Sequence, residues 1–166
     1  MTKETKVPMT PAVRVLTAAN VEFRPHFYEY QEHGGTARSS RELGVDEHIV
    51  VKTLVMEDDA KRPLIVLMHG DCAVATGKLA RAIGVKHVGP CTPETAEKHS
   101  GYRIGGTSPF GTRKALPIYL EKSVLDLPRI YINGGQRGFL VEIAPADVVR
   151  VLNPTLVEVA TCAQVG

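Results

Sequence analysis

The alternation of hydrophobic and polar residues predicts many short strands separated by short helices. Residues 49–56 and 63–69 are rich in aliphatic and β-branched side chains and contain no internal breaker, so both are predicted strands. The polar residues 57–61 between them predict a hairpin-like connection. Shorter apolar runs predict further strands over 86–88, 116–120, 129–132 and 139–143, and extended edge segments over 21–30 and 155–159.

Capping residues mark the predicted helices. Thr10 and Thr92 are each followed by proline, which is typical of an N-cap and the first helical position. Helices are predicted over 10–20, 36–43, 76–83 with Thr76 as its cap, 92–99, and from Pro145 onward. Asn133-Gly134-Gly135-Gln136 predicts the turn of a hairpin. Since strands and helices do not alternate regularly, we expect an α+β fold: a mixed sheet closing into a barrel-like core with peripheral helices.

Composition is typical of one soluble domain. The chain has 166 residues, of which 43% are hydrophobic and 23% charged, with a formal charge of +2. We expect a loose arm over residues 1–8 and one domain over 9–166. No apolar run reaches the length of a membrane span, and the start lacks the apolar core of a secretory signal, so we expect a cytoplasmic protein. Three widely spaced cysteines, at 72, 91 and 162, fit neither a disulfide framework nor a zinc module.

Residues 101–114 are the segment most typical of a site. Four glycines and Pro109 lie within eleven residues, and Arg113 and Lys114 follow closely. Glycine allows a backbone to approach a ligand closely, whereas proline fixes the direction of the chain. The segment is either a sharp loop between strands or a rigid cradle for a polar ligand, and the second interpretation is favoured.

Lys52 is the most informative single side chain. Strand alternation places it on the face of Val50, Leu54 and Met56, so one ammonium group lies on an otherwise apolar face. A charge in that position needs a partner or a ligand. The alternative is an edge-strand lysine whose stem packs while its head reaches water.

The sequence lacks three common functional motifs: a phosphate-binding loop, a metal-ligand spacing and the surroundings of a catalytic serine. Gly106 and Gly111 have the spacing of a phosphate-binding loop, but Thr112-Arg113 follows instead of Lys-Ser/Thr. The six histidines share no metal-ligand spacing, so no metal is expected. Ser108 lacks the context of a catalytic serine. A hydrolase of this sequence would therefore activate water or use a group of its own substrate.

Four segments, taken in order, closely resemble the YbaK-type aminoacyl-tRNA deacylases. They are residues 51–54 (VKTL), 105–111 (GGTSPFG), 131–138 (YINGGQRG) and 141–143 (VEI). These proteins are relatives of the editing domain inserted in bacterial prolyl-tRNA synthetase. The likeness runs from about residue 9 to residue 159, nearly the whole chain. The glycine-rich segment followed by the Gly-Gly-x-Arg-Gly hairpin is its specific part.

The resemblance implies hydrolysis of mischarged aminoacyl-tRNA in trans, with Cys-tRNA(Pro) the first candidate. It also implies partnership with tRNA, work alongside prolyl-tRNA synthetase as in many family members, no cofactor, no metal and no membrane. For a cysteinyl substrate, it implies that the substrate thiol attacks its own ester carbonyl. Lys52 and Gly105 would form the catalytic pair, and Arg113 and Lys114 would contact the tRNA backbone. The implied substrate-binding residues are Tyr28, Thr53, Gly106, Ser108, Pro109, Asn133, Gly134 and Leu140.

Two positions depart from the common family pattern, namely Asn133, where serine is usual, and Leu140, where a polar residue is usual. Both are expected near the pocket, so the amino acid that is removed stays open. Two alternatives remain: a deacylase for another small amino acid, such as alanine on tRNA(Pro), or a non-catalytic adaptor that binds tRNA or a synthetase.

Overall fold

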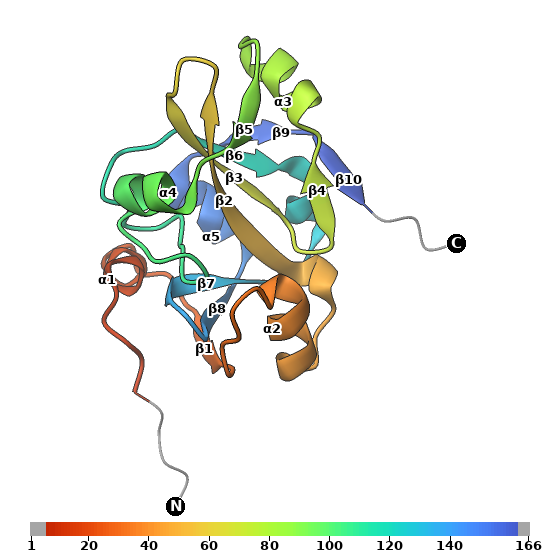
Figure 1. Cartoon of the computed structure of the whole chain (residues 1–166). Coiled ribbons are helices and arrows are strands. Elements are labelled where there is room, and N and C mark those ends of the chain that lie inside the picture. The colour runs from red at the N-terminus through yellow and green to blue at the C-terminus, as the bar shows by residue number, and fades with distance from the viewer. Residues whose placement is uncertain (1–5, 163–166) are drawn as a thin grey trace, which may run out of the picture.

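The computed structural model describes residues 6–162, so most of the predicted N-terminal arm (residues 1–5) and the last four residues lie outside the described part. A mixed sheet of eight strands forms the centre of the fold (Figure 1). Its main order is β1-β8-β7-β2-β3-β6-β9, and β5 pairs with the outer part of β2. The strands are β1 (Arg24–Phe27), β2 (Val50–Asp58), β3 (Pro63–His69), β5 (Val88–Pro90), β6 (Ile118–Glu121), β7 (Ile130–Gln136), β8 (Phe139–Ile143) and β9 (Thr155–Val157).

The sheet is mixed, as predicted. β2 runs parallel to β7, and β6 runs parallel to β3 and β9, whereas the other pairs of this sheet are antiparallel. The described pairings form an open path from β1 to β9, so closure into a barrel stays a prediction. Pro25 lies in the edge strand β1, where its missing N–H breaks no ladder.

β2 and β3 have unbroken apolar sequences because both of their faces are covered. Val51, Val55 and Leu67 belong to the larger hydrophobic core, which also receives buried side chains from α1 (Pro11–Ala18), α4 (Pro93–Ser100) and α5 (Pro145–Leu152). Met56 and Met68 point to a smaller core, covered by α3 (Thr76–Ile83). Strands buried on both faces are typically continuous apolar runs.

The helices begin largely where the sequence predicts. Thr10 and Thr92 cap α1 and α4, and each accepts a hydrogen bond from a backbone N–H in the first turn. α2 (Gly35–Leu43) ends at Gly44 in the left-handed conformation, as expected. Short 3-10 helices cover Glu47–Ile49 and Lys122–Asp126. Within residues 6–162, no helix is long and apolar enough to cross a membrane.

Three local predictions were wrong. Ala75, not Thr76, occupies the N-cap position of α3. The strand predicted over 86–88 forms at Val88–Pro90 instead, where it pairs with β2. Residues 133–136 do not form the hairpin turn, because the Asn133 side chain accepts hydrogen bonds from the Gly135 and Gln136 N–H groups and turns this segment into a bulge within β7.

The prediction that the cysteines form no disulfide was also wrong. β4 (Cys72–Val74) and β10 (Ala160–Cys162) make a separate two-stranded antiparallel sheet, and a disulfide joins Cys72 to Cys162. The two residues are 90 positions apart in the sequence, so no local spacing indicated the pairing. Cys91 is a free cysteine.

The Thr10 side chain has two partners, which suggests a stability test. Its hydroxyl donates to the Gly134 carbonyl at 2.5 Å and accepts from the Val13 N–H at 3.1 Å, and both bonds are buried. Thr10→Ala should lower the free energy of unfolding by about 2–3 kcal/mol, because it removes a cap and leaves a buried carbonyl unpaired. Thr92→Ala, which removes an exposed cap and an exposed hydrogen bond to the Thr95 hydroxyl, should cost about 1 kcal/mol. Urea unfolding measures both, and equal losses would contradict the role given to Gly134.

Candidate active site

The register of four neighbouring strands places a row of side chains on one face of the sheet. Val51 pairs with Ile132, so the next residues on these parallel strands, Lys52 and Asn133, lie side by side. Leu140 pairs with Asn133 on one side and with His26 on the other. Val51 and Ile132 point into the larger core, and the row therefore occupies the opposite face. Lys52, Asn133 and Leu140 are thus brought together on one face, and their roles as site residues stay predictions.

Lys52 is a half-buried ammonium group on a central strand. β2 lies between β7 and β3, which rules out the edge-strand interpretation. Its Nζ donates to the Gly70 carbonyl at 3.3 Å, and no carboxylate of the described residues forms an ion pair with it. Burial lowers the pKa of Lys52, while the carboxylates of Glu47 and Asp71 partly oppose this shift. Lys52 is therefore a half-buried amine with carboxylates nearby but without an ion-pair partner among the described residues.

The carbonyl that holds Lys52 is itself fixed by close packing. The Thr36 hydroxyl donates to the Glu47 carboxylate at 2.7 Å and also lies 3.2 Å from the Gly70 oxygen. A β-carbon at position 70 would approach the Thr36 side chain to 2.7 Å and the Val50 carbonyl to 2.8 Å, so only glycine fits there. α2 thereby sets the position of the Lys52 ammonium group.

The glycine-rich loop is tied to the β7–β8 hairpin by side chains of the hairpin. Asn133 Nδ2 donates to the Gly105 carbonyl at 3.1 Å, and Arg137 Nε donates to the Ile104 carbonyl at 2.7 Å. Gly106 packs directly against the hairpin backbone, since a β-carbon there would come within 2.8 Å of the backbone nitrogen of Arg137. The loop is therefore held on the same face of the sheet as Lys52.

Gly105 occupies a position that only glycine can take without strain. Its φ is +87°, and a β-carbon would lie 2.5 Å from the Tyr30 ring. The Arg137 guanidinium stacks over that ring at 4.6 Å from its centroid. Sequence reasoning missed both Tyr30 and Arg137. Tyr30 could have been indicated by its position two residues after Tyr28, which puts both side chains on one face of an extended segment. Arg137 could have been indicated by its position within the hairpin motif of residues 131–138.

Part of the loop backbone has hydrogen-bonding capacity that the fold does not use. The N–H groups of Gly105 and Thr107 donate to no protein acceptor within residues 6–162, whereas the Gly106 N–H closes a turn onto Arg103. Gly105 is also exposed. Unused backbone donors beside a cation suit the binding of an oxygen that carries negative charge.

Ser108 and Pro109 form a buried part of the glycine-rich loop. Both are buried, and Ser108 is fully buried, with its hydroxyl accepting a hydrogen bond from the Phe110 N–H. The buried Tyr102 hydroxyl donates to the Phe110 carbonyl at 2.6 Å, and burial raises its pKa to about 12. These residues fix the loop, and a substrate-binding role for Ser108 or Pro109 stays a prediction.

The structure separates Thr53 and Gly134 from the face that carries Lys52. Thr53 alternates with Val51 and Val55, which point into the larger core, and its buried hydroxyl has no hydrogen-bond partner among the described residues. Gly134 is packed against the Phe139 ring, and its carbonyl accepts the Thr10 hydroxyl. A substrate-binding role for Thr53 or Gly134 therefore stays a prediction.

Tyr28 lies beside the hairpin turn. Its N–H donates to the Gly138 carbonyl at 3.0 Å, which attaches the segment after β1 to the turn. Burial raises the pKa of its phenol, and a contact with the Gly138 backbone partly opposes the shift. Tyr28 and Tyr30 are thus neighbours of the Gly105 loop through the hairpin.

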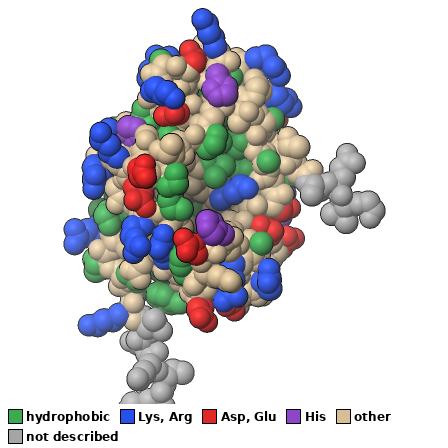
Figure 2. Space-filling model, in the orientation of Figure 1, with side chains coloured by type: hydrophobic (Ala, Val, Ile, Leu, Met, Phe, Trp, Pro, Cys, Tyr) green, Lys and Arg blue, Asp and Glu red, His purple; other side chains and the backbone are tan. Residues whose placement is uncertain are grey.

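Exposed basic side chains follow the glycine-rich loop in the chain. Figure 2 shows several along the edge of the molecule over α1 and α4. Arg113 and Lys114 are exposed, and Lys114 Nζ lies 2.9 Å from His99 Nδ1. Burial, together with the positive charges of Lys114 and Lys98, lowers the pKa of His99, so this imidazole is disposed to remain neutral. None of these lysines or arginines forms an ion pair within residues 6–162.

Comparison with known proteins agrees with this geometry. The sequence model of the aminoacyl-tRNA editing domain matches residues 32–151. The chain is 29% identical, over 97% of its length and 99% of the relative, to an Enterococcus faecalis protein named "Putative Cys-tRNA(Pro)/Cys-tRNA(Cys) deacylase EbsC". It is 28% identical to part of the proline–tRNA ligase of Levilactobacillus brevis, over 53% of this chain and 15% of the ligase.

A solved structure has the same fold over nearly the whole chain. It is described as "a putative trans-editing enzyme for prolyl tRNA synthetase", with a TM-score of 0.76 and 20% sequence identity, covering 93% of this chain and 99% of that one. The matched family segment contains Lys52, the Gly105 loop and the β7–β8 hairpin. The chain belongs to the aminoacyl-tRNA editing domain family.

Proposed function

We propose that this protein hydrolyses mischarged aminoacyl-tRNA in trans and that Cys-tRNA(Pro) is its main substrate. The observation that carries the proposal is the Asn133–Gly105 hydrogen bond, which holds a glycine loop with free backbone donors on the face of the sheet that carries Lys52. Family membership supports the reaction class, and the name of the E. faecalis relative supports the substrate. We further propose that it acts in the cytoplasm, alongside prolyl-tRNA synthetase.

In this proposal the protein acts mainly by positioning the aminoacyl ester. An aminoacyl ester is already activated, so a fixed orientation and stabilisation of the developing oxyanion can supply much of the rate. In the proposal, Lys52 contacts the ester region or the terminal nucleotide, and the exposed Gly105 N–H binds the ester through the backbone. Lys52 forms no ion pair among the described residues, which supports this role, because a paired carboxylate would compete with an anionic ligand.

For a cysteinyl substrate the nucleophile is the substrate's own thiolate. Its sulfur attacks the ester carbonyl carbon, and the bond from that carbon to the ribose oxygen breaks. The ribose oxygen takes up a proton and leaves as the tRNA hydroxyl, and water then opens the thiolactone to free cysteine. Both steps redistribute existing bonds and need no redox partner. The exposed cations Arg113 and Lys114 would contact phosphates of the tRNA backbone.

One observation favours alanine as a second candidate substrate. Leu140 lies beside Asn133 in the row and is only 4% exposed, so this part of the site offers a small apolar wall. Such a wall would suit a methyl side chain as well as a thiol, because a hydrophobic pocket discriminates weakly between small groups. A substrate with no thiol would need an activated water instead.

A panel of purified Cys-, Ala-, Ser- and Pro-tRNA(Pro) tests the proposal directly. We expect Cys-tRNA(Pro) to be deacylated faster than the other three, with Ala-tRNA(Pro) second. The readout is loss of acid-precipitable labelled amino acid, corrected for spontaneous hydrolysis. Binding without turnover on every member would contradict a deacylase and would leave the non-catalytic adaptor as the better description.

Lys52→Ala should lower kcat/KM for the preferred substrate by about 100-fold or more, since it removes the cation beside the ester. The fold should persist, because the side chain is only half-buried and makes one hydrogen bond, to Gly70. Lys78→Ala on α3 is the matched control, since Lys78 is an exposed lysine distant in sequence from the site. Full activity of Lys52→Ala with unchanged circular dichroism would remove Lys52 from the mechanism.

Asn133→Asp separates the two functions of Asn133. The carboxylate can still accept from the Gly135 and Gln136 N–H groups, which preserves the bulge, but it has no amide hydrogen to donate to the Gly105 carbonyl. We expect kcat to fall about tenfold or more as the loop loses its anchor, with a smaller change in unfolding midpoint than Asn133→Ala produces. If Asn133→Asp is as active as the parent protein, the loop does not need this anchor.

A further inference from the structure

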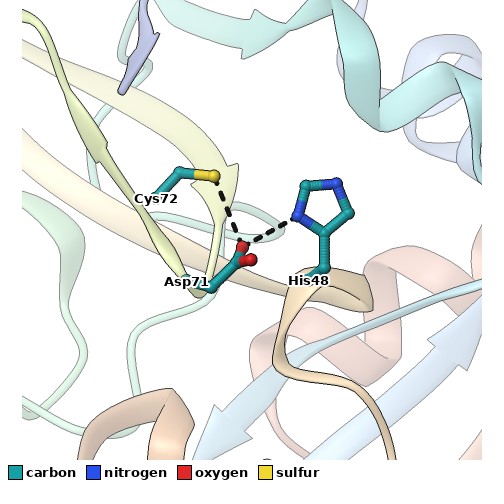
Figure 3. Close-up of side chains that lie close together, drawn as sticks. All are labelled: His48, Asp71 and Cys72. Atoms are coloured by element: carbon teal, nitrogen blue, oxygen red, sulfur yellow. Dashed lines mark hydrogen bonds and ion pairs between the residues drawn. The ribbon is translucent and has the colours of Figure 1, made fainter. Parts of the chain in front are cut away.

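Four potential metal ligands meet near the turn from β3 to β4, directly after Gly70, whose carbonyl holds Lys52. His48 precedes β2, Asp71 follows β3, and Cys72 begins β4 (Figure 3). His48 Nδ1 lies 2.8 Å from Asp71 Oδ1, and that oxygen lies 3.3 Å from Cys72 Sγ. These ligand atoms all lie within 4.8 Å of one another.

Cys162 supplies the fourth ligand atom. Its sulfur is bonded to Cys72 Sγ, so it also lies at the cluster. When the two cysteines are reduced, the cluster contains two thiols, an imidazole and a carboxylate, which is a ligand set typical of zinc. Asp71 and Cys72 are adjacent in the chain, but His48 and Cys162 come from distant segments, so local spacing does not indicate the complete set.

The imidazole of His48 is oriented before any ligand binds. Its ring stacks on His69, with centroids 3.8 Å apart and an interplanar angle of 7°. His69 is itself fixed, because one ring nitrogen lies 2.8 Å from the His48 carbonyl and the other 2.7 Å from the Ser123 hydroxyl. This arrangement directs His48 Nδ1 toward Asp71 and the sulfurs.

The spacing fits a tetrahedral centre after a small movement. Zinc bonds of about 2.0–2.3 Å require neighbouring ligand atoms roughly 3.3–3.8 Å apart. The contact between Asp71 and Cys72 already has this length. The two sulfurs must separate, and the exposed Cys162 in the terminal strand β10 can move outward, whereas Cys72 is buried. His48 Nδ1 and Asp71 Oδ1, now 2.8 Å apart, must also separate slightly, and both side chains are partly exposed.

We propose that His48, Asp71, Cys72 and Cys162 bind one Zn²⁺ in the reduced protein and release it when Cys72 and Cys162 form their disulfide. The oxidant is a low-molecular-weight disulfide. Exchange joins the two protein sulfurs, moves two electrons to the small disulfide, and yields two small thiols after proton uptake, with Zn²⁺ as the remaining product. A purely structural disulfide would not require the oriented imidazole and carboxylate beside it. The proposal does not depend on deacylation.

Zinc binding by the full-length chain tests this proposal. Protein reduced with a phosphine, with three reactive thiols counted, should take up one Zn²⁺ per chain in competition with a chromogenic chelator. Zinc should protect two thiols from alkylation, and Co²⁺ should give the absorption of a tetrahedral thiolate site. Protein oxidised with glutathione disulfide should lose this binding and retain one reactive thiol.

Variants assign the ligands. Cys162→Ser and His48→Gln should each weaken zinc binding by more than about tenfold, and Cys91→Ser should bind like the parent because Cys91 is outside the cluster. Cys162 is exposed, so its replacement leaves the core intact even if a Cys72 variant fails to fold. Two results would overturn the proposal: reduced parent protein that binds no zinc, or a Cys162→Ser variant that binds it with unchanged affinity and stoichiometry.

Discussion

The side chain of Asn133 makes the contacts on which the candidate site depends. Its amide oxygen accepts from two N–H groups of the hairpin, and its amide nitrogen donates to the Gly105 carbonyl 28 positions earlier in the chain. One planar group thus shapes the bulge in β7 and attaches the glycine loop to it. Because the bulge shortens the pairing with β8, the loop can lie flat against the hairpin at Gly106. Without this anchor, a segment so rich in glycine would have many accessible conformations.

The position of Lys52 sets a second constraint. A central strand covered on both faces is an unfavourable place for a charge, and burial accordingly lowers the pKa of Lys52. The fold supplies one carbonyl, from Gly70, and carboxylates that are near but not paired with it. The lysine is therefore held in place and remains available to an anionic ligand. A half-buried lysine with a lowered pKa and no ion-pair partner among the described residues is more typical of a functional site than of a lysine that only packs against the core.

Local chemistry explains which elements the sequence could predict. α1 and α4 were predicted at their N-termini because Thr-Pro specifies a cap and a first turn without help from distant residues. β2, β3 and β8 were predicted because their apolar runs exceed what a loop would contain. The turn expected over 133–136 was misplaced because a side-chain acceptor converted two glycines into a bulge. β4 and β10 were missed because each has three residues and is stabilised by its partner.

The sequence by itself determined the mixed α+β class and most helix starts, and it singled out Lys52 and the glycine-rich residues 101–114, since glycine, proline and an isolated charge have local consequences. Gly105, Asn133 and Leu140 were proposed as site residues through the resemblance to the deacylase family. Tertiary structure alone decided which of them share a face: Lys52, Asn133 and Leu140 align through strand register, while Thr53 points to the opposite side. It also added Tyr30 and Arg137 to the loop and brought Cys72 to Cys162. These outcomes depend on pairings between segments far apart in the chain, and residue type and local spacing do not encode them.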